Sequence, residues 1–175
     1  MHAPRTLALI GALTLAALTA GCSEPSAEAG HGNTGGKGGK GEAETAMQRA
    51  TRALNAVEPD SAAREDAGTA PLADGLDRTF TADGDRPYTF DIACQAAAAP
   101  HTVVLTLARG DAESEWEVEC GDREADQFIV PAGAPFTATV APAKPGVDGL
   151  ALWRLNTVAP EDVTDCADDI TGCEN

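Results

Sequence analysis

Apolar and polar residues alternate along the chain from residue 76 onward. Every second position is apolar in five runs, at residues 88–94, 103–107, 116–120, 136–140 and 151–155. A period of two is typical of β-strands with one buried face. Two weaker runs, at residues 79–81 and 127–130, bring the expected total to about seven strands.

Glycine, proline and aspartate separate these runs. Examples are Asp83-Gly84 and Pro145-Gly146. Short strands at regular spacing, divided by such turn residues, predict an all-β fold: a small antiparallel β-sandwich over residues 75–175. Pro160, followed by two acidic residues, predicts a short C-terminal helix, which we expect to carry Cys166.

A helical pattern precedes the strands. Apolar residues, most of them alanine, fall on one face of an amphipathic helix over residues 43–58, and Pro59 ends the pattern. So small an apolar face leaves two alternatives open, a helix docked on the domain and a marginal helix in the tether. Residues 59–74 are small and polar and are expected to form a linker. Residues 22–42 are rich in glycine and are expected to form a flexible tether.

The first residues combine Arg5, a short apolar stretch and the small pair Ala20-Gly21 directly ahead of Cys22. This is the pattern of an export signal. The apolar stretch has about 14 residues, fewer than the roughly 20 that span a bilayer. The segment that ends in Cys22 resembles the lipobox of bacterial lipoproteins. This resemblance implies a signal peptide over residues 1–21 and lipidation of Cys22.

The chain uses much alanine, glycine, aspartate and arginine, and little lysine, isoleucine or asparagine. This usage resembles that of high-GC Gram-positive bacteria, and the whole chain resembles their small surface lipoproteins. The resemblance implies a protein held at the outer face of the plasma membrane, with the lipid bilayer as a partner through acylated Cys22. It implies no particular activity. The alternative is an ordinary secreted protein that is cut near Ala20 and keeps Cys22 as a thiol.

Five cysteines are an odd number for an exported chain, and lipidation of Cys22 leaves an even set of four. Cys94 and Cys120 continue the apolar phase of their strands, so their side chains are expected in the core or facing each other on paired strands. We expect disulfides Cys94–Cys120 and Cys166–Cys173, one of three possible connectivities. A redox or metal site is the alternative, but the chain has no Cys-x-x-Cys motif. No metal is therefore expected.

The charge limits the partners. The formal net charge is −16, and removal of residues 1–21 with Arg5 lowers it to −17. No nucleic-acid partner is expected, because such a partner requires lysine and arginine to neutralise phosphates. An acidic surface suits cations, basic proteins or amine-bearing polymers, although solubility explains it equally well.

Candidate catalytic residues are few. His31 lies in the expected tether and His101 in a loop, and no fixed partner that would orient either for catalysis is evident. Glu117 and Glu119 alternate with apolar residues, which places them on the solvated face of a strand. A glycoside hydrolase would need two carboxylates across a deep cleft, which a small sandwich hardly offers. We expect no catalytic residue, no cofactor and no enzymatic activity.

Two acidic loops, residues 122–126 and 162–169, leave a second interpretation open. Carboxylates pinned by the two disulfides could hold Ca²⁺ weakly, because hard cations take several oxygen ligands. Neither loop has the spacing of an EF-hand, and solvated charge is the alternative.

The expected function is that of a lipid-anchored, extracytoplasmic protein of the cell envelope, whose small acidic β-sandwich is a binding or interaction module. Its partner would be an envelope protein or a cell-wall glycan. Two alternatives remain, a structural surface protein without a specific ligand and a carboxylate-based envelope hydrolase.

Overall fold

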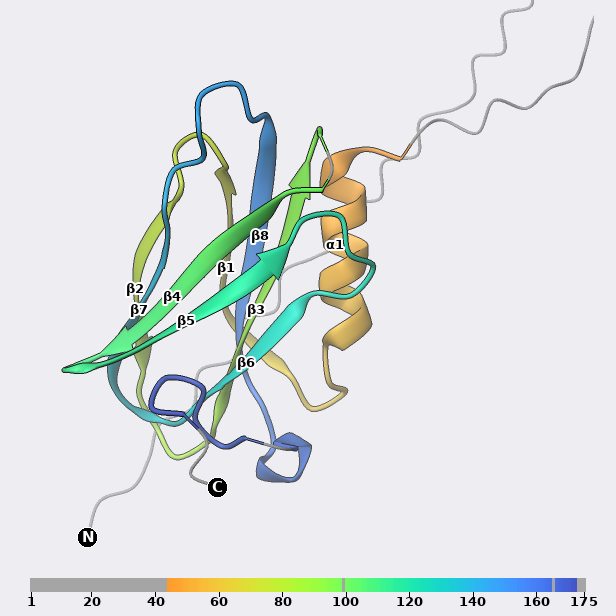
Figure 1. The fold of residues 1–175 in the computed structure, drawn as a ribbon. Helices are drawn as coiled ribbons and strands as arrows, with labels where there is room; N and C mark the ends of the chain where they lie inside the picture. The colour runs from red at the N-terminus through yellow and green to blue at the C-terminus, as the bar shows by residue number, and fades with distance from the viewer. Residues whose placement is uncertain (1–43, 99, 165, 173–175) are drawn as a thin grey trace, which may run out of the picture. The chain divides into compact units, whose positions relative to one another are not determined.

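The computed structural model describes residues 44–98, 100–164 and 166–172. The strands of this part form two four-stranded antiparallel sheets, which pack face to face as a sandwich (Figure 1). The first sheet has the order β1-β8-β3-β6 and the second sheet the order β2-β7-β4-β5. The predicted all-β sandwich is therefore confirmed. The elements are α1 (Ala46–Val57), β1 (Ala63–Pro71), β2 (Leu76–Ala82), β3 (Tyr88–Ala96), β4 (Thr102–Arg109), β5 (Ala112–Glu119), β6 (Asp126–Val130), β7 (Gly133–Val140), β8 (Gly149–Thr157) and the 3₁₀ turn η1 (Pro160–Asp162).

The predicted signal peptide, the lipidated Cys22 and the Gly-rich tether lie outside the described residues. Among the residues that the structure does describe, no helix is long and apolar enough to cross a membrane.

β1 corrects the prediction that residues 59–74 form a linker. The seven predicted runs correspond to β2 through β8, whereas β1 adds an eighth strand. Its residues are small or charged and its side chains are mostly exposed, so it lacks the apolar alternation by which strands are recognised. Backbone pairing with β8, from Ala63 opposite Thr157 to Pro71 opposite Leu150, holds β1 in place. The sandwich therefore begins at residue 63 rather than 75.

Four aromatic side chains form the centre of the core. Phe80 and Phe136 come from the second sheet, and Phe90 and Trp153 come from the first. Neighbouring ring centroids lie 5.0–6.4 Å apart. Burying each such side chain contributes about 1.5–3 kcal/mol or more, so this cluster is a main source of sheet-to-sheet stability.

The disulfide between Cys94 and Cys120 joins the two sheets. Cys94 belongs to β3 of the first sheet, and Cys120 directly follows β5 of the second sheet. The N–H of Gly121 also donates to the carbonyl of Cys94, at 2.8 Å. The first predicted pairing is thus present. Cys166 is also disulfide-bonded, but Cys173 lies outside the described residues, so the Cys166–Cys173 pairing stays a prediction.

Helix α1 is docked on the outer face of the first sheet (Figure 1). Thr45 begins the helix with a capping box, in which Thr45 and Gln48 exchange side-chain hydrogen bonds with each other's backbone N–H. The docked face is mostly alanine and packs on apolar residues of β3, β8 and the loop before β6. The side chains buried in this contact are Ala50, Ala53, Leu54, Ala93, Ala125 and Leu152. Of the two alternatives left open by the sequence, the helix is therefore docked on the domain.

The C-terminal segment closes the side of the sandwich between β5 and β6. Ile170 is buried in the main core. The Asp169 carboxylate accepts from the N–H of Ile129 at 2.6 Å, and the N–H of Asp169 donates to the Ile129 carbonyl at 2.9 Å. The helix expected here is only the single turn η1, which ends at Asp162, so Cys166 lies beyond it.

Candidate functional site

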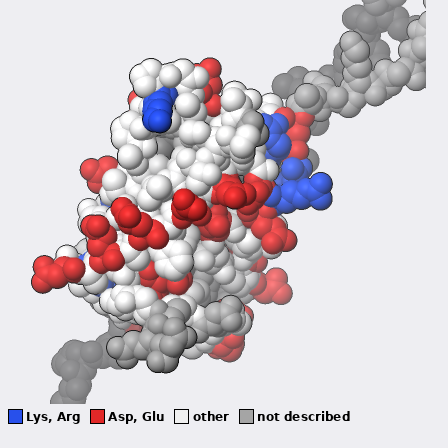
Figure 2. Space-filling model, in the orientation of Figure 1, with Lys and Arg blue, Asp and Glu red and all other residues white. Residues whose placement is uncertain are grey.

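A row of four glutamates follows β5. Glu113, Glu115, Glu117 and Glu119 occupy alternate positions and are all exposed, whereas Val118 between them is buried in the core. Figure 2 shows acidic side chains along the course of β5, in the same orientation as Figure 1. Alternate residues of a strand are about 6.7 Å apart. We call these four residues the acidic row. The prediction that Glu117 and Glu119 lie on a solvated strand face is confirmed.

Short side chains of β4 lie beside the acidic row. Val104 pairs with Glu117 and Thr106 with Glu115 in the β4–β5 register. Val104 is 46% exposed, one of two large hydrophobic side chains so exposed among the described residues. The outer face of the first sheet is covered by α1, whereas no described element covers this outer face of the second sheet. The acidic row and its neighbours on β4 therefore form an accessible surface.

The loop at residues 122–126 is held against α1. The N–H of Ala125 donates to the carbonyl of Ala53 at 3.2 Å. Burial raises the pKa of Asp126, and the nearby Asp122 and Glu119 raise it further. These carboxylates extend the negative potential of the acidic row around the Cys94–Cys120 disulfide.

The C-terminal aspartates mostly accept hydrogen bonds from the chain itself. The Asp168 carboxylate accepts from the N–H of Ile170 at 2.9 Å and from the hydroxyl of Thr171 at 2.8 Å. Asp162 accepts from the hydroxyl of Ser61. Asp165 lies outside the described residues. Within 44–98, 100–164 and 166–172, no three or more Asp, Glu, His or Cys residues are arranged to hold a metal ion.

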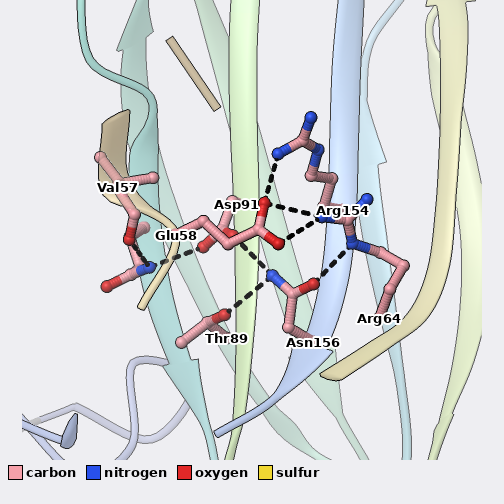
Figure 3. A network of polar contacts seen from close by, with 8 residues as sticks. Val57, Glu58, Arg64, Thr89, Asp91, Arg154 and Asn156 are labelled. Atoms are coloured by element: carbon pink, nitrogen blue, oxygen red, sulfur yellow. Dashed lines mark hydrogen bonds and ion pairs between the residues drawn. The ribbon is translucent and has the colours of Figure 1, made fainter. Parts of the chain in front are cut away.

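A buried polar network lies between α1 and the first sheet (Figure 3). Its centre is Asp91 of β3, whose side chain is fully buried. One Asp91 oxygen accepts from Gln127 Nε2 at 3.0 Å and the other from Asn156 Nδ2 at 2.9 Å. Burial raises the pKa of Asp91 to about 6; Glu58 also raises it, while hydrogen bonds from Gln127 and Thr89 and the charge of Arg154 oppose the rise.

The same network ties the end of α1 to four strands. Gln127 Nε2 also donates to the carbonyl of Val57, the last residue of α1, at 3.1 Å. Glu58 receives ion pairs from Arg64 of β1 at 2.7 Å and from Arg154 of β8 at 2.6 Å. Arg64 Nε donates to Asn156 Oδ1 at 2.6 Å. These contacts position α1, the element through which the expected tether reaches the sandwich.

Sequence reasoning missed this network. Asp91 alternates with apolar residues as any solvated strand residue does, and its burial follows only from the docking of α1 above it. The apolar face predicted for the helix indicated that the helix could cover part of a sheet. It did not indicate which strand the helix would cover.

An open depression lies at one end of the sandwich. It is lined by Glu65 of β1 and by the loop from Asp83 to Tyr88. The Tyr88 hydroxyl donates to the carbonyl of Asp83. Burial raises the pKa of Tyr88, and the charges of Glu65 and Asp83 add to the rise. This depression is one of several open ones among the described residues, and its Glu65, Asp83 and Asp85 are carboxylates of the kind that the hydrolase alternative requires.

Of the two histidines considered in the sequence, His101 lies in the loop before β4, as predicted. His101 is half-buried before β4, and its carbonyl accepts from the N–H of Cys120 at 2.8 Å, as part of the β4–β5 pairing. His31 lies outside the described residues.

No protein-family model, curated protein or solved structure matches this chain.

Proposed function

We propose that this chain is a lipid-anchored, extracytoplasmic protein of the cell envelope that presents its acidic β-sandwich as a binding module. The observation that carries the proposal is the acidic row on an uncovered sheet face. Helix α1, which continues the expected tether, packs on the other sheet and leaves this face accessible. The anchor itself rests on the lipobox-like segment that ends in Cys22.

The partner that suits such a surface carries positive charge. Complementary potentials raise association rates and disfavour partners of like charge. An envelope protein with a basic surface, or a cell-wall glycan with free amines, meets this requirement. The proposed role is binding rather than catalysis, because the carboxylates of the acidic row lie along an exposed strand rather than across a cleft.

The binding role is tested by chemical crosslinking of the full-length protein in intact cells, followed by capture and mass spectrometry. We expect a recurring envelope partner whose yield falls when Glu115 and Glu117 are changed to Gln. Changing the exposed Asp74 and Asp77 to Asn removes the same number of charges elsewhere and serves as the matched control. Recovery of nothing but the chain itself would refute the binding role and favour a structural surface protein.

The anchor is tested separately. Cys22→Ala should move the protein from the membrane fraction to the medium, because no acyl chain can then be attached. Ser23→Ala, one residue further along, should leave it in the membrane fraction. Persistence of the Cys22→Ala variant in the membrane fraction would contradict lipid anchoring.

A further inference from the structure

We propose that β5 is a docking edge for an extended basic segment of a partner protein. The segment adds to the second sheet as a fifth strand and places Lys or Arg opposite the acidic row. This inference rests on the proposed function, for which it names the partner class and the mode of binding.

The first argument is the direction of the backbone groups. Cys120 donates its N–H to the carbonyl of His101, and these two residues come directly after the pair of Thr102 and Glu119 that ends the β4–β5 register. In an antiparallel pair, hydrogen-bonded and non-hydrogen-bonded positions alternate. Trp116 and Val118 therefore direct their N–H and C=O groups toward β4, whereas the residues of the acidic row direct theirs toward the open edge.

These outward backbone groups have no partner among the described residues. β5 is the last strand of the second sheet, and its strand pairing is with β4 alone. No backbone hydrogen bond outside the strands involves residues 113–119 in the described part of the chain. An edge of this kind is a template for strand addition.

The second argument is that the same four residues supply both the free backbone groups and the charges. In an added antiparallel strand, the residues opposite the acidic row form the hydrogen-bonded pairs, and their side chains lie on the same face as the glutamates. Successive glutamates are about 6.7 Å apart, the distance between alternate residues of a strand. The fitting partner therefore carries Lys or Arg at every second position.

The third argument comes from the other edges. The β1 register shifts between Arg64 and Asp66, and the β2 register shifts between Phe80 and Ala82. The edge of β6 is occupied at Ile129 by Asp169. Bulges and covering segments are common ways of blocking an edge. Within the described chain β5 has no bulge, because its eight pairs with β4 show no shift. The C-terminal segment reaches β5 at Ser114, whose hydroxyl donates to the Asp169 carbonyl at 2.6 Å, but it makes no hydrogen bond to the outward backbone groups of β5 among the described residues.

The glutamates also select the occupant. A second copy of this chain, pairing β5 with β5, would set glutamate opposite glutamate, which is unfavourable. An acidic or neutral strand gains no compensating contact, whereas a basic strand gains an ion pair at each alternate residue. The competing explanation is that the charges of the acidic row only prevent other strands from pairing with β5. In that case no partner strand binds there.

The test uses the full-length chain in detergent and a synthetic peptide of alternating lysine with threonine or valine. One control peptide has the same composition with its lysines in one block. In a second control, the backbone amide nitrogen of each lysine residue is methylated. This keeps every side-chain charge but removes the backbone N–H groups that would donate to β5. We expect both controls to bind at least about tenfold more weakly than the alternating peptide. Binding should also slow amide hydrogen exchange at residues 113, 115, 117 and 119.

Variants of the chain locate the contact. Changing both Glu115 and Glu117 to Gln removes two cross-strand ion pairs and should weaken binding between about twofold and thirtyfold. The double change of Asp74 and Asp77 to Asn should leave binding within about twofold, because these residues lie away from β5.

Four outcomes would overturn the inference. They are equal binding of the N-methylated peptide, no binding of any peptide, unchanged exchange along β5, and self-association of the native chain through β5. Crosslinking in cells to a recurring partner at a site away from β5 would also refute it, while leaving the proposed function standing. Crosslinking that recovers no partner at all would refute the proposed function itself.

Discussion

The free energy of unfolding of Asp91→Asn, measured against that of the native chain, should increase as the pH rises from 4 to 7. Asp91 is fully buried beneath α1 and receives hydrogen bonds from Gln127 and Asn156, but makes no direct ion pair with any described residue. Its charged form is therefore disfavoured in the folded state, and burial is the main cause. Asn has nearly the same shape and carries no charge at any of these pH values.

The sign follows from the direction of the pKa shift. The pKa of Asp91 rises from 3.8 in the unfolded reference to about 6 in the fold. The folded state therefore holds the proton more tightly, so the contribution to stability is complete below pH 4 and is lost as the pH rises through 6. A shift of about two units at 1.36 kcal/mol per unit gives a loss of about 3 kcal/mol by pH 7.

Urea unfolding at pH 4, 5, 6 and 7, followed by tryptophan fluorescence, measures this difference. The free energy of unfolding of the variant minus that of the native chain should increase by about 2.4 kcal/mol over this range, because at pH 4 the unfolded carboxyl is already partly ionised. The cost of fitting an amide among the existing donors enters at every pH and cancels from the increase. Asp77→Asn, which removes an exposed carboxylate from β2, serves as the matched control for the loss of one negative charge.

Two results would refute the reasoning. A difference between variant and native chain that does not change with pH would show that Asp91 titrates alike in both states. A difference that shrinks as the pH rises would show that the network favours the charged carboxylate, and that the hydrogen bonds from Gln127, Asn156 and Thr89 outweigh burial.

Three further predictions concern packing and the disulfides. Cys94→Ala should lower the melting temperature far more than Cys173→Ala does. The Cys94–Cys120 disulfide joins the two sheets and stabilises the fold by about 3.5 kcal/mol through loop entropy. Equal small losses in calorimetry would contradict this. Leu54→Ala should lower the free energy of unfolding in urea by about 2–3 kcal/mol, whereas Met47→Ala, at an exposed position, should change it little. Equal effects of the two changes would show that the docking of α1 adds no stability. Gly68→Ala should cost about 1–3 kcal/mol, because a Cβ at this position would overlap the Trp153 indole, and an unchanged midpoint would show that the ring can move.

The acidic row could be located from the sequence alone. Glu117 and Glu119 alternate with Trp116 and Val118, and a strand of period two has only one exposed face for them. What the alternation left open was which strands form edges. Edge position depends on strand order, and strand order is set by long-range pairing that local patterns do not encode.

β1 and Asp91 show the limits of local pattern in opposite ways. β1 has no apolar alternation and is held by backbone hydrogen bonds to β8, which any residue except proline can donate. Asp91 does alternate with apolar residues, which is the pattern of a solvent-facing position, but α1 covers it. In both cases the deciding partner is remote, about 90 residues away for β1 and about 35 for Asp91.

The sequence by itself therefore determined the strands with an apolar phase, the helix, the buried phase of Cys94 and Cys120, and the side of β5 that bears charge, because each depends on the period of one short segment. The tertiary structure alone decided that α1 covers the first sheet and leaves the second open. It also decided that Asp91 is buried and that β5 ends a sheet with the backbone groups of its glutamates directed outward. These features depend on which surfaces meet, and that is settled by the packing of the whole chain rather than by any segment of it.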